Sequence, residues 1–479
     1  MRSRVTRKYF ATISTLLVCA VTTPTRAASI TVTNTNDSGP GSLRQALRDA
    51  NEGDTITFAV TGTITLSSGG LPIAKNLTIS GPGGDQLSVD GNQALLVFGI
   101  FPDKTATISG LTVTNGQFGI WSYQGTLTLN NCVVSLNSYG GIWNDHGGST
   151  LSNCVVSGNS YVGILNDGSV GPPPPIEGRN AERVGDDHPF GIPFLTIADS
   201  IVRDNFGHGV SNISATLTIL NSTLIGNSVV GDSGGGISSG GFKAPGSVTV
   251  ISSTVSGNSA DSGGGIASSY WSLTVVNSTI SGNSAGSGGG IANYTGALEI
   301  TNSTISSNSA SYDGGGIYSE GSVLYGAPLE IANSTISGNS AGSGGGIYND
   351  QQSSLEIYST ILNAGASGEN IFNNGDTVIS DGYNVSSDDG SGFLTGPGDQ
   401  INTDPLLGPL QDNGGPTFTH LPLPGSPAID TGDPNFTRPP FNDQRGICFY
   451  RVFGRRIDVG SVETQPRPRC PTPAPRPTP

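Results

Sequence analysis

The stretch "NSTISGNSAGSGGGI" occurs twice without change, at residues 277–291 and again at residues 333–347. A glycine-rich run can cradle phosphate, which would indicate a nucleotide-binding loop. That motif needs a strand, one glycine turn and then a helix, whereas this run recurs several times and opens no helical pattern. An unchanged repeat is instead typical of a structural unit that stacks on copies of itself.

The repeat extends well beyond these two copies. Successive units align on the last Asn of the "SGN" element, with common spacings of 22, 25 and 31 residues and one of 46 that contains an insert. The aligned residues are Asn137, Asn159, Asn205, Asn227, Asn258, Asn283, Asn308 and Asn339. An apolar residue precedes each Asn by three positions, and a glycine-led apolar residue follows within ten.

Each unit holds three short segments of alternating polarity, such as "LTV", "STIS" and "GGIA". Period 2 places Leu273, Val275 and Ile280 on one side, and Thr274 and Thr279 on the other. Three short strands and tight turns close a triangular coil with apolar residues inside, and the next coil pairs with it as parallel strands. The chain is therefore predicted to be all-β: a right-handed parallel β-helix of about thirteen coils.

Two details of the repeat have a structural explanation in this fold. Residues 288–290 are glycines, which suit turns that need positive φ or close backbone approach. Asn277 and Asn283 begin or follow strands, so stacked Asn side chains can hydrogen-bond along a column.

The flanking segments suggest how the chain is organised. Residues 1–27 have the basic start and short apolar run of a secretory signal peptide. In residues 28–54, "GSLRQALRDAN" predicts a short helix that caps the open end, with Ser42 and Gln45 spaced as a capping box. Less regular coils are expected over 55–125 and regular repeats over 126–363, interrupted at 167–194 by a Pro-rich loop. Regular repeats fade over 364–465, and 466–479 form a Pro-rich tail expected to be disordered.

Charge and cysteine content limit the partners. Removing the five cations of the leader leaves 16 cations against 36 acids, a net charge of −20, which disfavours nucleic acid. No later apolar run is long enough for a membrane helix, so an exported, monomeric protein is expected. Cys132 and Cys154 stand in matching contexts and are interpreted as small buried residues rather than a disulfide; the state of Cys448 and Cys470 stays open.

Three regions resemble known bacterial families. Residues 34–51 resemble the N-terminal region of surface β-helix proteins with a C-S-L-R-E-A motif, although Gly41 and Gln45 replace its Cys and Glu. Residues 402–463 resemble the choice-of-anchor C-terminal domain of the Q type. The repeats are similar to those of chlamydial polymorphic membrane proteins, in the forms Gly289-Gly290-Ile291 and Ile280-x-x-Asn283. These resemblances imply a secreted or surface-displayed bacterial β-helix protein and no particular reaction.

Three functions fit this picture. The first is a non-catalytic adhesin-like or matrix protein that contacts an unidentified extracellular glycan or protein. The second is a polysaccharide-active enzyme, either a lyase or a glycoside hydrolase similar to polygalacturonases. Its candidate residues are Asp199, Arg203, Asp204 and His208, beside Asp186 and Asp187 of the insert. The third is a module that binds a glycan or a cation on a flat face.

One column of the repeat raises the question of a metal. Thr128, Thr150, Thr196, Thr218, Thr249 and Thr274 give way to Glu299, Glu330 and Glu356. Stacked carboxylates about 4.8 Å apart repel each other unless they extend into water, share a proton or hold a cation. The favoured outcome is a solvated surface, with calcium bridging as the alternative that can be tested. No other cofactor is expected.

Overall fold

The structure is a computed structural model that describes residues 27–169, 192–241, 246–437 and 439–466. Residues 1–26 of the predicted signal peptide lie outside the described residues, and so does the predicted tail from residue 467. The same holds for most of the insert, with Asp186 and Asp187, and for Cys470.

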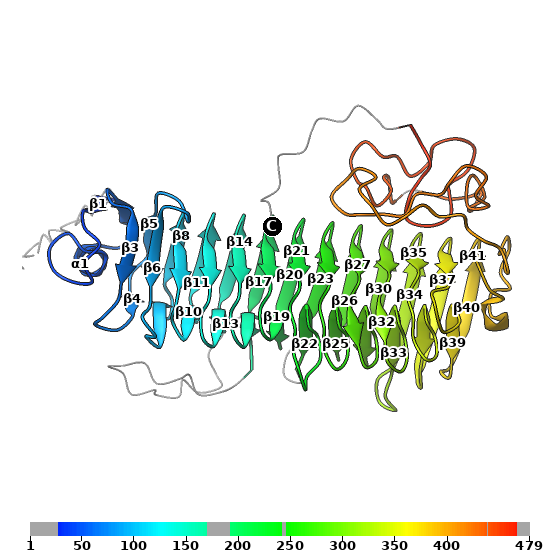
Figure 1. The fold of residues 1–479 in the computed structure, drawn as a ribbon, viewed down its shortest axis with the longest axis horizontal. Coiled ribbons are helices and arrows are strands. Elements are labelled where there is room, and N and C mark those ends of the chain that lie inside the picture. Colours follow the sequence, from blue (N-terminus) through cyan, green and yellow to red (C-terminus); the bar gives the residue numbers. More distant parts are fainter. Residues whose placement is uncertain (1–26, 170–191, 242–245, 438, 467–479) are drawn as a thin grey trace, which may run out of the picture.

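The chain winds into an elongated solenoid with three parallel sheets along its length (Figure 1). Sheet A has fourteen strands, sheet B thirteen and sheet C twelve, as the prediction of about thirteen coils requires. Sheet A consists of β1 (Ser29–Val32), β2 (Thr55–Phe58), β5 (Leu77–Ser80), β8 (Thr105–Ser109), β11 (Thr126–Asn130), β14 (Gly148–Ser152), β17 (Phe194–Ala198), β20 (Thr216–Leu220), β23 (Ser247–Ile251), β26 (Ser272–Val276), β30 (Leu298–Thr301), β34 (Ala327–Ala332), β37 (Ser353–Tyr358) and β40 (Val378–Gly382).

The other two sheets complete each coil. Sheet B consists of β3 (Gly62–Thr65), β6 (Leu87–Asp90), β9 (Thr112–Thr114), β12 (Val133–Ser135), β15 (Val155–Ser157), β18 (Ile201–Arg203), β21 (Thr223–Ile225), β24 (Thr254–Ser256), β27 (Thr279–Ser281), β31 (Thr304–Ser306), β35 (Thr335–Ser337), β38 (Ile361–Asn363) and β41 (Val385–Ser386). Sheet C consists of β4 (Leu71–Ile73), β7 (Leu96–Ile100), β10 (Phe118–Tyr123), β13 (Gly140–Asp145), β16 (Val162–Asp167), β19 (His208–Ile213), β22 (Ile237–Gly240), β25 (Ile266–Ser269), β29 (Ile291–Tyr294), β33 (Ile317–Glu320), β36 (Ile347–Asn349) and β39 (Ile371–Asn373). The short strands β28 (Ser284–Ala285) and β32 (Ser309–Ala310) pair separately at a turn.

The interior is a continuous apolar column, as the alternation predicts. Ile280 has no exposed surface and pairs in register with Val255 on one side and Ile305 on the other. Cys132 and Cys154 are buried and free, which confirms their interpretation as small interior residues.

The predicted Asn column is also present. Along the eight aligned Asn residues from Asn137 to Asn339, seven side-chain amides donate to the Oδ1 of the Asn in the next coil, and the last, that of Asn339, donates to the carbonyl oxygen of Ile305. Asn302 likewise donates to Asn277 at 2.7 Å. The longer ladder satisfies buried polar groups at one corner of eight successive coils and holds these coils in register.

The glycine turn of the repeat needs glycine for the predicted reason. Gly288 has φ +64°, and a Cβ on Gly289 would lie 2.4 Å from the carbonyl oxygen of Ser309 in the next coil. The N–H groups of Gly288 and Gly289 donate to Asp313 and Gly314 of that coil. They are therefore engaged in stacking, which argues against a phosphate loop.

A helix is present where the sequence predicts one. Helix α1 (Leu43–Asp49) lies at the N-terminal end of the solenoid, with Leu43, Ala46 and Leu47 buried (Figure 1). Ser42 Oγ accepts from the N–H of Gln45 at 3.2 Å. The reciprocal bond of a capping box is missing, because Gln45 Oε1 accepts from Arg48 and the Ser42 N–H donates to the Gly39 carbonyl.

The C-terminal region departs from a simple stack. The three sheets continue past residue 363 through β39, β40 and β41. A turn of 3-10 helix, η1 (Gly390–Gly392), follows, and Leu394 packs on the end of the core. The described residues between 404 and 466 then lie along the outer face of sheet B, where Gln444 bonds to Thr304 at 2.6 Å and Ser461 to Thr335 at 3.1 Å (Figure 1).

Candidate functional site

The outer face of sheet C changes character along its length. One in-register column begins with large side chains, passes through four small residues and returns to aromatic rings. Its members are Trp121, Trp143, Leu165, Ser211, Ser238, Ala267, Ala292, Tyr318, Tyr348 and Phe372. Because strands are about 4.8 Å apart, Leu165 and Tyr318 stand about 24 Å apart with a low floor between them.

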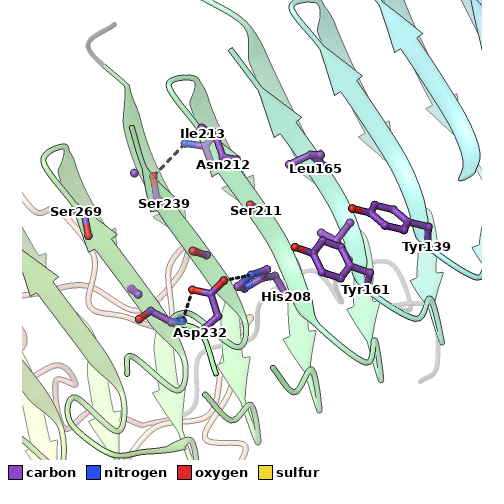
Figure 2. A pocket seen from close by; sticks show the side chains of 15 residues that line it. Tyr139, Tyr161, Leu165, His208, Ser211, Asn212, Ile213, Asp232, Ser239 and Ser269 are labelled. Atoms are coloured by element: carbon purple, nitrogen blue, oxygen red, sulfur yellow. Dashed lines mark hydrogen bonds and ion pairs between the residues drawn. The ribbon is translucent and has the colours of Figure 1, made fainter. Parts of the chain in front are cut away.

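The N-terminal half of this floor lines a pocket of about 460 Å³ (Figure 2). We call it the sheet C groove. Its floor includes Ser211, Ser238 and Ala267, and its sides include Tyr161, His208 and Asp232. Figure 2 shows Tyr161 between His208 and Tyr139, which lines the end of the groove.

Stacked rings form the N-terminal wall of the groove. Tyr139 lies 4.9 Å from Phe118 and 4.7 Å from Tyr161 between ring centroids, and the two tyrosines are nearly parallel at 28°. Tyr139 thus covers one face of the Tyr161 ring, while Tyr161 itself is 54% exposed. The outer face of Tyr161 is therefore available to a ligand.

His208 is held in one orientation beside Tyr161. Its Nδ1 lies 2.9 Å from the carbonyl oxygen of Gly234, which can only accept, so Nδ1 carries a proton. Its Nε2 points to Asp232 Oδ2 at 3.4 Å. The His208 side chain is nearly buried and the Asp232 side chain is 60% exposed, so the carboxylate is the part of the pair that a ligand meets first.

Two carboxylates next to the groove have structural partners. Asp145 is buried and accepts hydrogen bonds from Trp121 Nε1 at 3.2 Å and His146 Nδ1 at 2.6 Å. Burial raises the pKa of Asp145, and the hydrogen bond that His146 donates to Asp145 raises the pKa of His146. Asp167 pairs in register with Asp145 and accepts from the Ser169 N–H. Asp145 thus serves to fix the aromatic wall.

The opposite wall is also aromatic and acidic. Tyr318, Tyr348 and Phe372 stack, with centroids 5.5 and 4.8 Å apart. The Tyr318 hydroxyl donates to Asp350 at 2.7 Å and to Glu320 at 3.0 Å. Burial, together with these carboxylates, raises the pKa of Tyr318.

The candidate catalytic residues do not converge. Asp199 follows β17 in a turn and accepts from Asn221. Arg203 and Asp204 lie at the end of β18 on sheet B, 3.8 Å apart between Nη1 and Oδ2. His208 begins β19 on sheet C, where its partner is Asp232. Among the described lining residues of the groove, Asp232 is the single carboxylate, so the paired acids of glycoside hydrolysis are not assembled there.

Sequence reasoning missed Asp232, Tyr139 and Tyr161. A signal for the tyrosines was present, since "NSYGG" and "NSYVG" place Tyr at the same position of successive repeats.

The glutamate column forms as predicted. Glu299, Glu330 and Glu356 pair in register on sheet A and are exposed. A hydrogen bond with Asp381 raises the pKa of Glu356. Within the described parts of the chain, no group of three acidic, His or Cys side chains is arranged to hold a metal ion. Calcium binding by this column stays a prediction.

Comparisons with known proteins agree with the fold. Residues 62–244 match the family described as a right handed beta helix region, and residues 302–320 and 333–350 match the Chlamydia polymorphic membrane protein repeat. No curated protein matches. No helix in the described residues is long and apolar enough to cross a membrane.

Solved structures also match. The A-module of the mannuronan C-5 epimerase AlgE6 of Azotobacter vinelandii is 14% identical, with 74% of this chain and 97% of that one covered and a TM-score of 0.50. Pectate lyase Pel9A is 13% identical, covering 91% and 96%, with a TM-score of 0.43. The catalytic unit of a GH87 alpha-1,3-glucanase from Streptomyces thermodiastaticus is 15% identical, covering 77% and 71%, with a TM-score of 0.49. The match to the epimerase module, at this identity, extends to the fold alone. The chain is thus a right-handed parallel β-solenoid that carries repeats similar to those of chlamydial polymorphic membrane proteins.

Proposed function

We propose that this protein is an exported bacterial surface or extracellular protein that binds an extended glycan along the sheet C groove without cleaving it. The observation that carries the proposal is the free ring face of Tyr161, set beside the His208–Asp232 pair at the edge of a floor of small residues. An aromatic face binds the apolar face of a sugar ring, and nearby polar groups pair with its hydroxyls. The match to repeats of surface proteins and the predicted signal peptide support export.

The ends of the chain have roles in the same proposal. In this proposal helix α1, whose Leu43, Ala46 and Leu47 are buried, serves as the cap that a solenoid needs at its open end. The C-terminal region that resembles an anchor-type domain keeps the protein at the cell surface while its solenoid reaches outward as a monomer.

The alternative is a polysaccharide-active enzyme on the same fold. The position of His208 Nε2 at the groove favours it, because an imidazole there could move a proton. A lone carboxylate beside it argues against the two-acid hydrolytic mechanism.

A glycan array with product analysis tests the proposal. Wild-type protein should bind at least one extended glycan and release no reducing ends or unsaturated products. Tyr161→Ala should weaken binding roughly tenfold, about 1.4 kcal/mol, through loss of the stacking face. Tyr450→Ala is the matched control, since Tyr450 is 57% exposed on the C-terminal region and should bind as wild type.

Two outcomes would contradict this function. If wild-type and Tyr161→Ala proteins bind every glycan equally, the groove is not the site. If products form and His208→Ala abolishes them, the protein is an enzyme.

A further inference from the structure

The charges around the sheet C groove are one-sided. The twelve strands of sheet C contain Asp145, Asp167 and Glu320 but no Lys or Arg. Asp232 lines the groove itself, and Asp350 follows β36 at the far wall. Over the described residues between 105 and 444, Arg203 is the one Lys or Arg, and it belongs to sheet B, beside Asp204.

The acidic side of the groove is reinforced from the neighbouring coil. The N–H of Asp261 donates to the carbonyl oxygen of Asp232 at 2.9 Å, so these two residues lie side by side. Asp261 Oδ1 accepts from the N–H of Gly231 at 3.2 Å. The nearest imidazole, His208, is largely covered, whereas the Asp232 carboxylate is mostly in solvent. A ligand entering beside Tyr161 therefore meets negative charge.

This charge pattern bears on the kind of glycan that fits. A uronate polymer carries a carboxylate on every residue, and in the groove it would face acidic groups with no described Lys or Arg to balance them. An amino sugar carries an ammonium, which carboxylates and the face of a tyrosine ring both attract. The negative charge around the groove changes the binding free energy of an uncharged sugar very little.

We infer that the sheet C groove prefers amino-bearing hexose polymers, accepts uncharged ones more weakly and rejects polyuronates. The inference rests on the proposed glycan-binding function and deepens it by naming the charge class of the ligand. The Asp232 carboxylate, which lines the same groove as Tyr161 and lies 3.4 Å from His208 Nε2, is the specificity-determining contact.

Titration of three hexasaccharides tests the inference: β-1,4-linked glucosamine, its N-acetylated form and α-1,4-linked galacturonate. The glucosamine hexamer should bind roughly tenfold more tightly than the N-acetylated one at about 20 mM salt, and the galacturonate hexamer should not bind measurably. Raising the salt to about 500 mM should remove most of the difference, because exposed charges are then screened.

A variant and its control locate the effect. Asp232→Asn should reduce the preference for glucosamine at least threefold while leaving binding of the N-acetylated hexamer within a factor of two. Glu299→Gln makes the same charge change on sheet A, in the exposed column, and should leave the preference intact. An equal loss in both variants would mean that overall charge, not the groove, sets the preference, and would overturn the inference.

The results also separate the two proposals. If no hexamer or array glycan binds, the glycan-binding function fails. If the N-acetylated or galacturonate hexamer binds best, the function stands and the inference on charge is wrong.

Discussion

Replacing Asn283 by Ala should destabilise the solenoid by about 4 kcal/mol, although Asn283 contacts no ligand. Its side chain takes part in four hydrogen bonds. The Nδ2 group donates to the Val255 carbonyl at 3.0 Å and to Asn308 Oδ1 at 2.9 Å. The Oδ1 atom accepts from the backbone N–H and from the side-chain amide of Asn258, both at 3.0 Å.

The magnitude follows from what these partners lose. Among the described residues the buried Asn258 N–H has no other acceptor, and leaving it unpaired would cost about 1–3 kcal/mol. The Asn258 side-chain amide still donates to the Leu224 carbonyl, and Asn308 Oδ1 still accepts from the Asn283 N–H. Each of these two groups therefore loses one of its two hydrogen bonds, which lowers the free energy of unfolding by about 0.5–1 kcal/mol per group. Loss of the bond to the Val255 carbonyl lowers the free energy of unfolding by a similar amount. Together these losses come to about 4 kcal/mol.

Urea unfolding followed by circular dichroism would measure the change, with hydrogen exchange at Asn258 to locate it. Asn374→Ala is the matched control, because Asn374 is exposed and makes one side-chain bond, to Asp350 at 3.0 Å. It should cost less than about 0.5 kcal/mol. A loss below about 1 kcal/mol for Asn283→Ala would refute the idea that the Asn ladder holds the coils together.

Three further predictions concern the core, the glutamate column and the C-terminal region. Ile280→Asp would bury an unpaired charge in a fully buried position and should cost several kcal/mol, so a melting temperature within a degree or two of wild type would contradict the observed packing. If Glu299, Glu330 and Glu356 hold calcium, the ion should raise the melting temperature and Glu330→Gln should erase the gain; identical melting in calcium and in chelator would leave them as solvated surface. Burial and the neighbouring Asp458 raise the pKa of Glu463 from 4.5 to about 8, so the folded chain keeps a proton that the unfolded chain has released. Stability should therefore fall as pH rises through this window, by at most roughly 1.4 kcal/mol per pH unit, and unfolding of Glu463→Gln should lack this dependence.

The fold was predictable because every coil has to bury the same kind of apolar strand face and close the same kind of turn. Apolar residues at period 2, an Asn at a fixed corner and a glycine turn recur often enough that alignment alone identifies Ile280 as interior and Asn283 as part of a column. The C-terminal region was harder, because its contacts with sheet B join residues more than a hundred positions apart. The bond between Gln444 and Thr304 is one example, because no periodic pattern in the sequence predicts it.

The groove was missed for a different reason. Tyr161 and His208 belong to adjacent coils, yet 46 residues separate the paired positions Val162 and His208 because the insert lies between them. The sequence from Asp199 to His208 is one continuous stretch, but the β-solenoid distributes it over several faces, and a site is assembled from residues of neighbouring coils.

The same logic shows what the alignment could have revealed. The glycine-led apolar residues Ile142, Ile164, Val210 and Ile237 point inward, so the residue after each must point outward. Those next residues run from large to small, ending in Ser211 and Ser238, and the change marks the start of the groove floor. Since the core column is almost invariant in chemistry from coil to coil, selection for a ligand has to act on these outward columns. Where an outward column changes its residue type within one sheet, a binding site is the first hypothesis to test.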